Sequence, residues 1–86
     1  MNPQERFAAN LRRARTVAGI SQEELGDRCN LHRTEISLLE RAGREPRLGT
    51  IVKLAGALET TPGELCAGIS WVPSSHKFDV KQPRSN

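Results

Sequence analysis

The chain has 86 residues, with 13 Lys and Arg against 10 Asp and Glu, which gives a formal net charge of +3 at pH 7. This length fits one small domain, and the basic balance mildly favours a polyanionic partner. Tyr is absent and aromatic residues make up 3% of the chain, too few for a typical β-sandwich. We therefore expect an all-α domain with a core of Leu, Ile and Ala.

The sequence lacks the signatures of membrane proteins, metalloproteins and enzymes. No apolar run is long enough to cross a membrane, and the start MNPQERF lacks the hydrophobic region of a secretory signal, so we expect a soluble, cytoplasmic protein. Cys29 and Cys66 have no CxxC neighbour and, with His32 and His76, form no ligand cluster. We expect buried thiols, no metal, no cofactor and no small-molecule ligand. Without a nucleophile motif, paired acid–base carboxylates or a glycine-rich phosphate loop, we predict no catalytic residues.

The first predicted helix spans about residues 3 to 18, with Pro3 near its start and Gly19 as its stop. This spacing is typical of an amphipathic helix with one buried face. Its apolar residues recur at steps of four, three and four: Phe7, Leu11, Ala14 and Ala18.

The segment SQEELGDRCN predicts a second helix. Ser21 and Glu24 match a capping box, in which the side chain of each residue accepts a hydrogen bond from the backbone of the other. Leu25 and Cys29 form the inward pair of this helix. Asn30 follows and is one of the few residues besides glycine that tolerates a left-handed turn.

A third helix is predicted from about His32 to Arg41. At ~100° per residue, Leu38 lies about 200° from Ile36, so these two residues cannot share one buried stripe. We expect Leu38 to be exposed in the middle of a small polar face. One side of the helix carries Ile36, Leu39 and Glu40, and the other carries Thr34, Ser37, Leu38 and Arg41.

Two further helices follow the turn-rich segment AGREPRLG. In the fifth, Thr61 is the cap, Pro62 occupies the first helical position and Glu64 completes a second capping box. We therefore expect five short helices between about residues 3 and 67. The fourth helix has one apolar face: Ile51, Leu54, Ala55 and Leu58.

The second and third helices fit a helix-turn-helix. Two short helices that cross steeply need a small residue where they approach, here Gly26, and a left-handed turn residue, here Asn30. Residues 5–68 closely resemble the Cro/CI-type helix-turn-helix domains of phage repressors (the XRE family), through SQEEL, ISLLER, REP and TPGEL. The resemblance implies a five-helix, lambda-repressor-like fold that binds DNA as a homodimer on a palindromic operator.

Two positions depart from the family pattern. Gly26 replaces the usual alanine, and Ala42 stands where glycine usually ends the recognition helix. We expect Gly43 to supply the left-handed residue and to shift the helix end by one position.

The resemblance also implies that residues 32–41 form a recognition helix, which enters the major groove N-terminus first. Arg33 can pair with guanine or hold a phosphate, and Leu38 suits a thymine methyl group. The alternatives are a solvated charge at Arg33 and an ordinary exposed leucine or subunit contact at Leu38. The predicted DNA-binding residues are Gln22, His32, Arg33, Thr34, Ser37, Leu38, Arg41, Arg44 and Arg47.

Other charged residues would position the domain on DNA. Arg44 and Arg47 flank the loop before the fourth helix, where they would hold phosphates together with helix N-termini. The family commonly pairs a glutamate such as Glu40 with an arginine such as Arg15, a structural pair that orients the recognition helix. Acids outnumber bases by six to five over residues 21–47, but three of these acids lie in the second helix and can face away from DNA.

The C-terminal segment GISWVPSSHKFDV predicts a hairpin, in which Ile69 and Trp71 share one side, and Phe78 and Val80 share another. An isolated hairpin is marginal in water, so it needs support. We expect residues 69–80 to extend the domain of residues 1–68 as a dimer interface. Packing on the chain's own core and disorder are the alternatives. Residues 81–86 should form a frayed tail.

These features predict a bacterial or phage transcriptional regulator that binds double-stranded operator DNA as a homodimer and associates with the nucleoid. One alternative is an antitoxin-like or accessory subunit that uses the same fold to hold a protein partner. Another is a restriction–modification controller, with the same DNA-binding chemistry in a different circuit.

Overall fold

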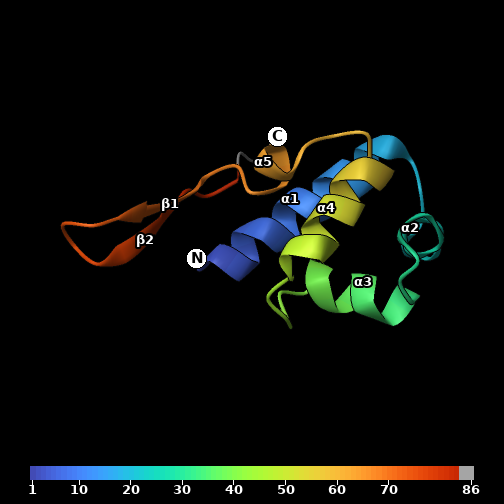
Figure 1. Cartoon of the computed structure of the whole chain (residues 1–86), viewed down its shortest axis with the longest axis horizontal. Helices are drawn as coiled ribbons and strands as arrows, with labels where there is room; N and C mark the ends of the chain where they lie inside the picture. Colours follow the sequence, from blue (N-terminus) through green and yellow to red (C-terminus); the bar gives the residue numbers. More distant parts are fainter. Residues whose placement is uncertain (84–86) are drawn as a thin grey trace.

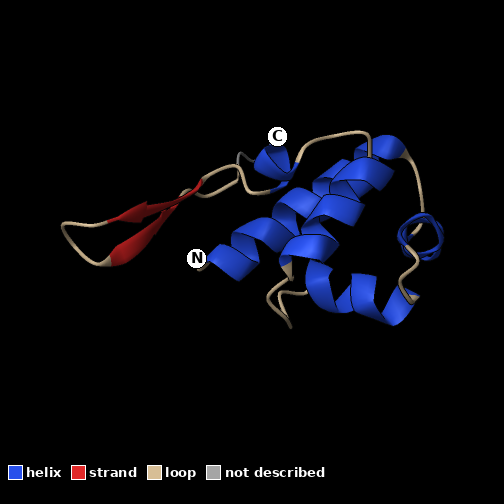
Figure 2. Cartoon of the chain, in the orientation of Figure 1, coloured by secondary structure: helices blue, strands red, loops and turns tan. Residues whose placement is uncertain are grey.

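The computed structural model describes residues 1–83 and contains five helices followed by a β-hairpin (Figure 1). Helices α2 and α3 lie at one end of the helical body, and the hairpin projects from the opposite side (Figure 2). The expected fold class is confirmed. The elements are α1 (Pro3–Ala18), α2 (Gln22–Cys29), α3 (Arg33–Glu40), α4 (Leu48–Ala57), α5 (Pro62–Leu65), β1 (Ile69–Val72) and β2 (Lys77–Val80).

The hydrophobic core draws on all five helices, which explains why these short segments are stable together. The predicted inward residues of α1 to α4 are buried or half-buried, with one exception. Ala18 is exposed, because α1 ends there at Gly19, whose φ of 74° turns the chain away. The largest fully buried side chains are Leu11, Leu25, Ile36, Leu39, Leu54 and Leu65.

The helix N-termini are capped by short polar side chains. The hydroxyl groups of Ser21 and Thr61 accept hydrogen bonds from the backbone N–H groups three residues on, which is one half of each predicted capping box. The complete box forms at α1 instead, where Asn2 and Glu5 exchange side-chain and backbone hydrogen bonds of 2.7 and 2.8 Å. The Asn-x-x-Glu spacing of residues 2–5 is the sequence signal of this box.

The turn between α2 and α3 depends on Gly26 and Asn30, as predicted. Asn30 is left-handed, with φ of 57°. The N–H group of Leu31 donates to the carbonyl of Gly26 at 2.8 Å, so the turn lies directly against α2. A Cβ atom on Gly26 would stand 2.5 Å from the Leu31 carbonyl oxygen. Glycine at this position therefore lets α3 approach α2 closely.

The end of α3 differs from the expectation. Ala42, not Gly43, takes the left-handed conformation, with φ of 57°. The N–H groups of Ala42 and Gly43 donate to the carbonyls of Leu39 and Leu38, at 3.2 and 2.8 Å, which is the bond pattern of a Schellman motif. Gly43 lies close to Leu38 instead: a Cβ atom here would stand 3.0 Å from Cδ2 of Leu38 and would push the end of that side chain aside by a few tenths of an ångström.

The hairpin places its four predicted interface residues on one face. Ile69 pairs with Val80 and Trp71 pairs with Phe78 across the antiparallel strands, so each pair projects to the same side. The expectation that Ile69 and Trp71 share one side and Phe78 and Val80 another was therefore wrong. Alternation along the sequence shows which residues of one strand share a face. Which residues of the two strands share a face depends on the register between the strands, which alternation does not give.

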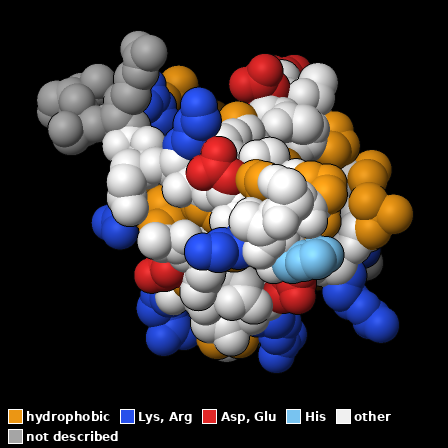
Figure 3. All heavy atoms as spheres, turned by 90° about the vertical axis from the view of Figure 1, so that its left-hand side faces the viewer, with side chains coloured by type: hydrophobic (Ala, Val, Ile, Leu, Met, Phe, Trp, Pro, Cys, Tyr) orange, Lys and Arg blue, Asp and Glu red, His pale blue; other side chains and the backbone are white. Residues whose placement is uncertain are grey.

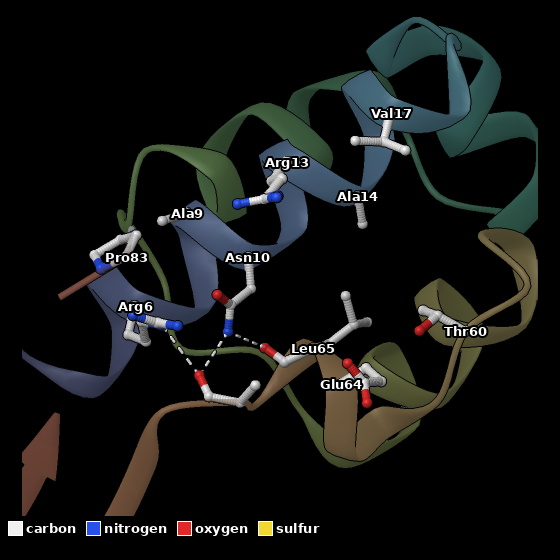
Figure 4. A pocket seen from close by; sticks show the side chains of 11 residues that line it. Arg6, Ala9, Asn10, Arg13, Ala14, Val17, Thr60, Glu64, Leu65 and Pro83 are labelled. Atoms are coloured by element: carbon white, nitrogen blue, oxygen red, sulfur yellow. Dashed lines mark hydrogen bonds between the residues drawn. The ribbon is translucent and has the colours of Figure 1, made fainter. Parts of the chain in front are cut away.

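Two side chains of α1 fasten the hairpin to the helical body (Figure 4). Arg6 donates to the carbonyls of Ala67 and Lys81, at 3.0 and 2.6 Å, and so holds the chain on both sides of the hairpin. Asn10 donates to the carbonyls of Leu65 and Ala67, both at 2.9 Å. Lys81 belongs to the expected tail yet is fixed here, while residues 84–86 of that tail lie outside the described residues.

Substitution of Gly26 tests the close approach of α2 and α3. Gly26→Ala should lower the free energy of unfolding by about 1–3 kcal/mol, since its Cβ meets a backbone oxygen and not a movable side chain. Gly56→Ala in α4 is the matched control, because no atom lies within 4 Å of its added Cβ, and it should stabilise by up to about 1 kcal/mol. Urea unfolding of both variants checks this, and equal stabilisation by both would contradict it.

Candidate nucleic-acid interface

Helix α3 starts at the surface with its first turn open to solvent. His32 is the N-cap: its Nδ1 accepts the N–H of Thr34 at 3.0 Å, so its imidazole has a structural role in starting the helix. Arg33 and Thr34 are exposed, whereas Ile36 and Leu39 on the opposite face are buried. Lys and Arg side chains project along the lower edge of the molecule in Figure 3, the edge at which Figure 1 places α3.

An ion pair between α1 and α3 fixes the position of α3. Arg15 donates from Nε to Oε2 of Glu40 at 2.6 Å and from its terminal nitrogen to Oε1 at 3.0 Å. The side chains are 14% and 3% exposed, and the carboxylate hydrogen bond raises the pKa of Arg15 further above its ordinary value. Arg15 also donates to the carbonyl of Ile20 at 2.9 Å, which ties the α1–α2 turn to the pair.

Gln22, expected to face DNA, belongs to this same network. Its side-chain amide donates to Oε1 of Glu40 at 3.1 Å. Because Gln22 is the first residue of α2, the Glu40 carboxylate contacts side chains from both of the other helices around α3. The three residues therefore set the angle at which α3 meets α1 and α2.

The open face of α3 is narrower than the sequence predicted. Arg33, Thr34 and Arg41 are exposed, but Ser37 and Leu38 are half-buried. The expectation of a bare Leu38 was wrong, because the Ala42–Gly43 turn folds back onto it, with the Gly43 N–H bonded to the Leu38 carbonyl. Helical periodicity could not show this, since the covering segment comes from beyond the helix end.

The loop before α4 carries Arg44, which forms an ion pair, and Arg47, which forms none within residues 1–83. Arg44 donates to Oε1 of Glu35 at 2.6 Å, so it is held beside the first turn of α3. Arg47 is the N-cap of α4 and makes no side-chain capping bond, which leaves the first N–H groups of α4 available to an anion. Glu35 was not predicted as a site residue, and no sequence pattern signals a pair nine positions apart.

Ion pairing shifts the charge balance around α3 towards positive. Glu40 is neutralised by Arg15, which lies outside the segment that the sequence count covered, and Glu24 is paired with Arg28 on the exposed side of α2. Among residues 1–83, Arg33, Arg41 and Arg47 form no ion pair. The open face of α3 and the start of α4 therefore carry three unpaired arginines, while Glu45 in the loop between Arg41 and Arg47 also forms no ion pair within residues 1–83.

The hairpin residues divide into an inner and an outer pair. Ile69 and Val80, near the helical body, are half-buried, and Ile69 packs against the core. Trp71 and Phe78 are 51% and 56% exposed, and their rings meet edge to face with centroids 5.2 Å apart. The outer aromatic pair therefore does not cover the helical core of its own chain.

Other kinds of site are not evident in the described part of the chain. Residues 1–83 hold no group of three or more His, Cys, Asp or Glu side chains that could bind a metal ion. None of the described helices is both long and apolar enough to cross a membrane. Burial raises the pKa values of the Cys29 and Cys66 thiols, and a raised pKa keeps a thiol protonated and unreactive.

Comparisons with known proteins converge on one kind of domain. The helix-turn-helix family model HTH_3 matches residues 11–65. Control protein C.SmaI of Serratia marcescens is 40% identical over 65 residues, covering 76% of this chain and 77% of the relative. The family match includes α2 and α3 and ends before the hairpin.

Several solved structures are similar to this chain, among them a controller protein and a repressor with sequence identity above 25%. The restriction-modification controller protein C.AhdI from Aeromonas hydrophila has 40% identity and a TM-score of 0.71, covering 72% of this chain and 94% of that one. The P22 c2 repressor, solved in complex with a synthetic operator, has 29% identity and a TM-score of 0.68 over the same shares.

The Arg15–Glu40 pair leads to a test by a double-mutant cycle. Arg15→Met should destabilise by about 3 kcal/mol, because it leaves the buried Glu40 carboxylate without its cation. Arg15→Met with Glu40→Leu should recover much of this loss, since the double change removes both charges. Urea unfolding of the four proteins measures the cycle. Losses that simply add would show that the pair has no coupling energy.

The exposed pair on α2 provides the control for this cycle. Arg28 and Glu24 also meet at 2.6 Å, but their side chains are 45% and 50% exposed. Arg28→Met should therefore cost roughly 0.5 kcal/mol or less, as is usual for surface pairs.

Proposed function

This chain belongs to the helix-turn-helix family HTH_3 and is a DNA-binding transcriptional regulator, not an enzyme; on that premise we propose that it reads an operator as a homodimer through α3. The single observation that carries the proposal is the exposed start of α3, where Arg33 and Thr34 face solvent and Glu35 holds Arg44 beside them. The buried Arg15–Glu40 pair supports it, because that pair holds α3 in one orientation. A rigid helix with an open N-terminal turn fits the major groove.

In this proposal only a few residues contact the bases directly. Arg33 is long enough to bond two acceptors of one guanine, and Thr34 beside it offers a hydroxyl group. Ser37 and Arg41 lie further along the open side of α3 and remain candidates. Leu38 keeps at most the exposed edge of its side chain for a thymine methyl group, because it is half-buried.

Phosphate contacts surround this reading face. Arg44, Arg47 and the free N–H groups at the start of α4 would hold one stretch of backbone. Binding by Arg44 competes with its ion pair to Glu35, so a phosphate must replace that carboxylate. His32 and Gln22 are engaged within the protein, which limits them to contacts through their remaining polar atoms.

A homodimer would read two half-sites related by a two-fold axis. The exposed Trp71 and Phe78 support the hairpin as the dimer contact, because such aromatic side chains are enriched at interfaces. Two linked reading heads bind with high effective concentration, whereas one α3 offers only a few base contacts.

Similarity to control proteins supports a particular circuit. C.SmaI is a control protein, and C.AhdI is a restriction-modification controller, so we propose that this chain regulates a restriction–modification system. The antitoxin-like alternative has no comparable support. A restriction–modification controller and an antitoxin-like subunit can share this fold. Selection of bound sequences from random DNA distinguishes a protein that recognises a DNA sequence from one that binds a protein partner.

Two arginines should show different effects on DNA binding. Arg33→Ala should cost about 1–3 kcal/mol of operator affinity and relax preference at one base pair per half-site. Arg44→Ala should weaken binding to all sequences alike and reduce the slope of log K against log salt by about 0.9 per half-site. Titrations of operator and scrambled duplexes at several salt concentrations measure both effects. Unchanged base preference in Arg33→Ala would assign Arg33 a purely positional role.

The Glu35 carboxylate supplies the opposite control for Arg44. Glu35→Gln should release Arg44 and strengthen binding to operator and scrambled duplex by the same factor. A change in base preference would instead place Glu35 among the reading residues.

Selection of bound sequences from a random duplex pool tests the proposed function directly. The proposal predicts enrichment of a palindromic motif whose half-sites are about one helical turn apart, or a multiple of it. A single unrepeated motif would contradict the homodimer. No enrichment at low salt would favour the protein-interaction alternative.

A further inference from the structure

A small cavity of about 230 Å³ lies where the hairpin joins the helical body. Pockets for drug-sized ligands measure about 300–1,000 Å³, so this cavity suits a single large side chain better than a small molecule. Its walls come from the start of α1, the α3–α4 loop, α4 and the hairpin. The lining is mainly apolar, with Phe7, Pro46, Ile51, Ile69 and Phe78, and Gln4 and Glu45 are its polar residues.

A large aromatic side chain stands beside this cavity without entering it. Trp71 is half exposed and touches Phe78 at a ring edge, but it does not line the cavity. Trp71 and the cavity wall residues Ile69 and Phe78 lie on the same face of the hairpin. One face of each chain thus carries both an unburied aromatic ring and an unfilled apolar cavity.

The register of the hairpin makes these two features self-complementary. Trp71 lies two residues beyond Ile69 along β1, an offset of about 7 Å towards the tip. When two hairpins meet face to face in opposite directions, with the two-fold axis between Ile69 and Trp71, each Trp71 lies opposite Ile69 in the cavity wall of the other chain. Such a reciprocal contact is what a two-fold interface requires.

We propose that a second copy of this chain fills the cavity, with the Trp71 ring of each subunit inserted between Phe7, Ile51 and Phe78 of the other. The inference rests on the proposed homodimer and deepens it by naming the receiving site. It differs from a simple face-to-face contact of hairpins, because it uses α1 and α4 of the partner as well.

The area available is consistent with a stable dimer. Aromatic side chains bury about 150–250 Å² each, so the half-exposed rings of two Trp71 and two Phe78 side chains still offer on the order of 400 Å². The cavity walls that cover them add a similar area. Together these approach the roughly 1,000 Å² that a specific interface needs, and the exposed Val52 of α4 next to Ile51 can add to it.

The cavity also borders the loop that we assign to phosphate binding. Pro46 lines the cavity and lies between Arg44 and Arg47 in the chain. A ring inserted against Pro46 would therefore hold this loop in place. Dimer formation and the positioning of the phosphate contacts become one event in this arrangement.

A second groove gives the rival site for a dimer. It has a volume of about 660 Å³ and runs between α1 and α5, where Arg13, Val17, Glu64 and Leu65 line it (Figure 4). This groove is larger than one side chain, and charged residues stand along it. The exposed aromatic side chains among residues 1–83, Trp71 and Phe78, both lie on the hairpin and do not line this groove.

Two substitutions test whether the dimer forms through the hairpin cavity or through the α1–α5 groove. Gln4→Phe adds a ring at the hairpin cavity, and Val17→Phe adds the same ring at the α1–α5 groove. Sedimentation equilibrium gives the dimer dissociation constant, and the emission of Trp71, the only tryptophan in the chain, reports its burial. Gln4→Phe should weaken the dimer at least roughly tenfold, and Val17→Phe should change it by less than about twofold.

The emission of the unmodified protein completes the test. It should shift to shorter wavelength as concentration drives dimer formation, with Trp71→Ala weakening the dimer at least as much as Gln4→Phe. Dimers with unchanged Trp71 emission, or weakened only by Val17→Phe, would overturn the receiving site but leave the homodimer intact. A protein that stays monomeric even on operator DNA would instead overturn the homodimer itself. Thermal melts confirm that each variant is folded.

Discussion

The buried pair of Arg15 and Glu40 is the contact on which the rest of the arrangement depends. Helix α3 has only eight residues, too few to be stable alone, and only Ile36 and Leu39 bury it in the core. Hydrophobic contacts are not directional, whereas a bidentate ion pair with 2.6 and 3.0 Å bonds fixes an angle. Because Gln22 bonds the same carboxylate, α1, α2 and α3 are held at one point.

This constraint leaves the open side of α3 free for the proposed contact with DNA. The inward side of α3 carries one charged residue, Glu40, and Arg15 of α1 balances its charge. The open side can then remain positive through Arg33 and Arg41 although acids outnumber bases in the surrounding segment. The turn at Gly26 complements the pair, since it allows α3 to lie close to α2 while keeping the first turn of α3 exposed.

Periodicity and capping residues were sufficient to predict the helices, their caps at Ser21 and Thr61, and the left-handed turn at Asn30. What the sequence could not give depended on contacts between segments. Leu38 is covered by a turn from beyond its own helix, and the hairpin sides were related by a register that alternation alone does not fix. Arg44 pairs with Glu35 across nine positions, a contact that follows from how the loop folds back.

Native-state hydrogen exchange tests most directly whether the Arg15–Glu40 pair holds α3 in place. In the unmodified protein, the α3 amides should open with nearly the same free energy as those in the middle of α1. In Glu40→Gln the opening free energy of α3 should fall below that of α1, because α3 then loosens before the core unfolds. Independent opening of α3 in the unmodified protein, or an equal fall for both helices in Glu40→Gln, would contradict the claim.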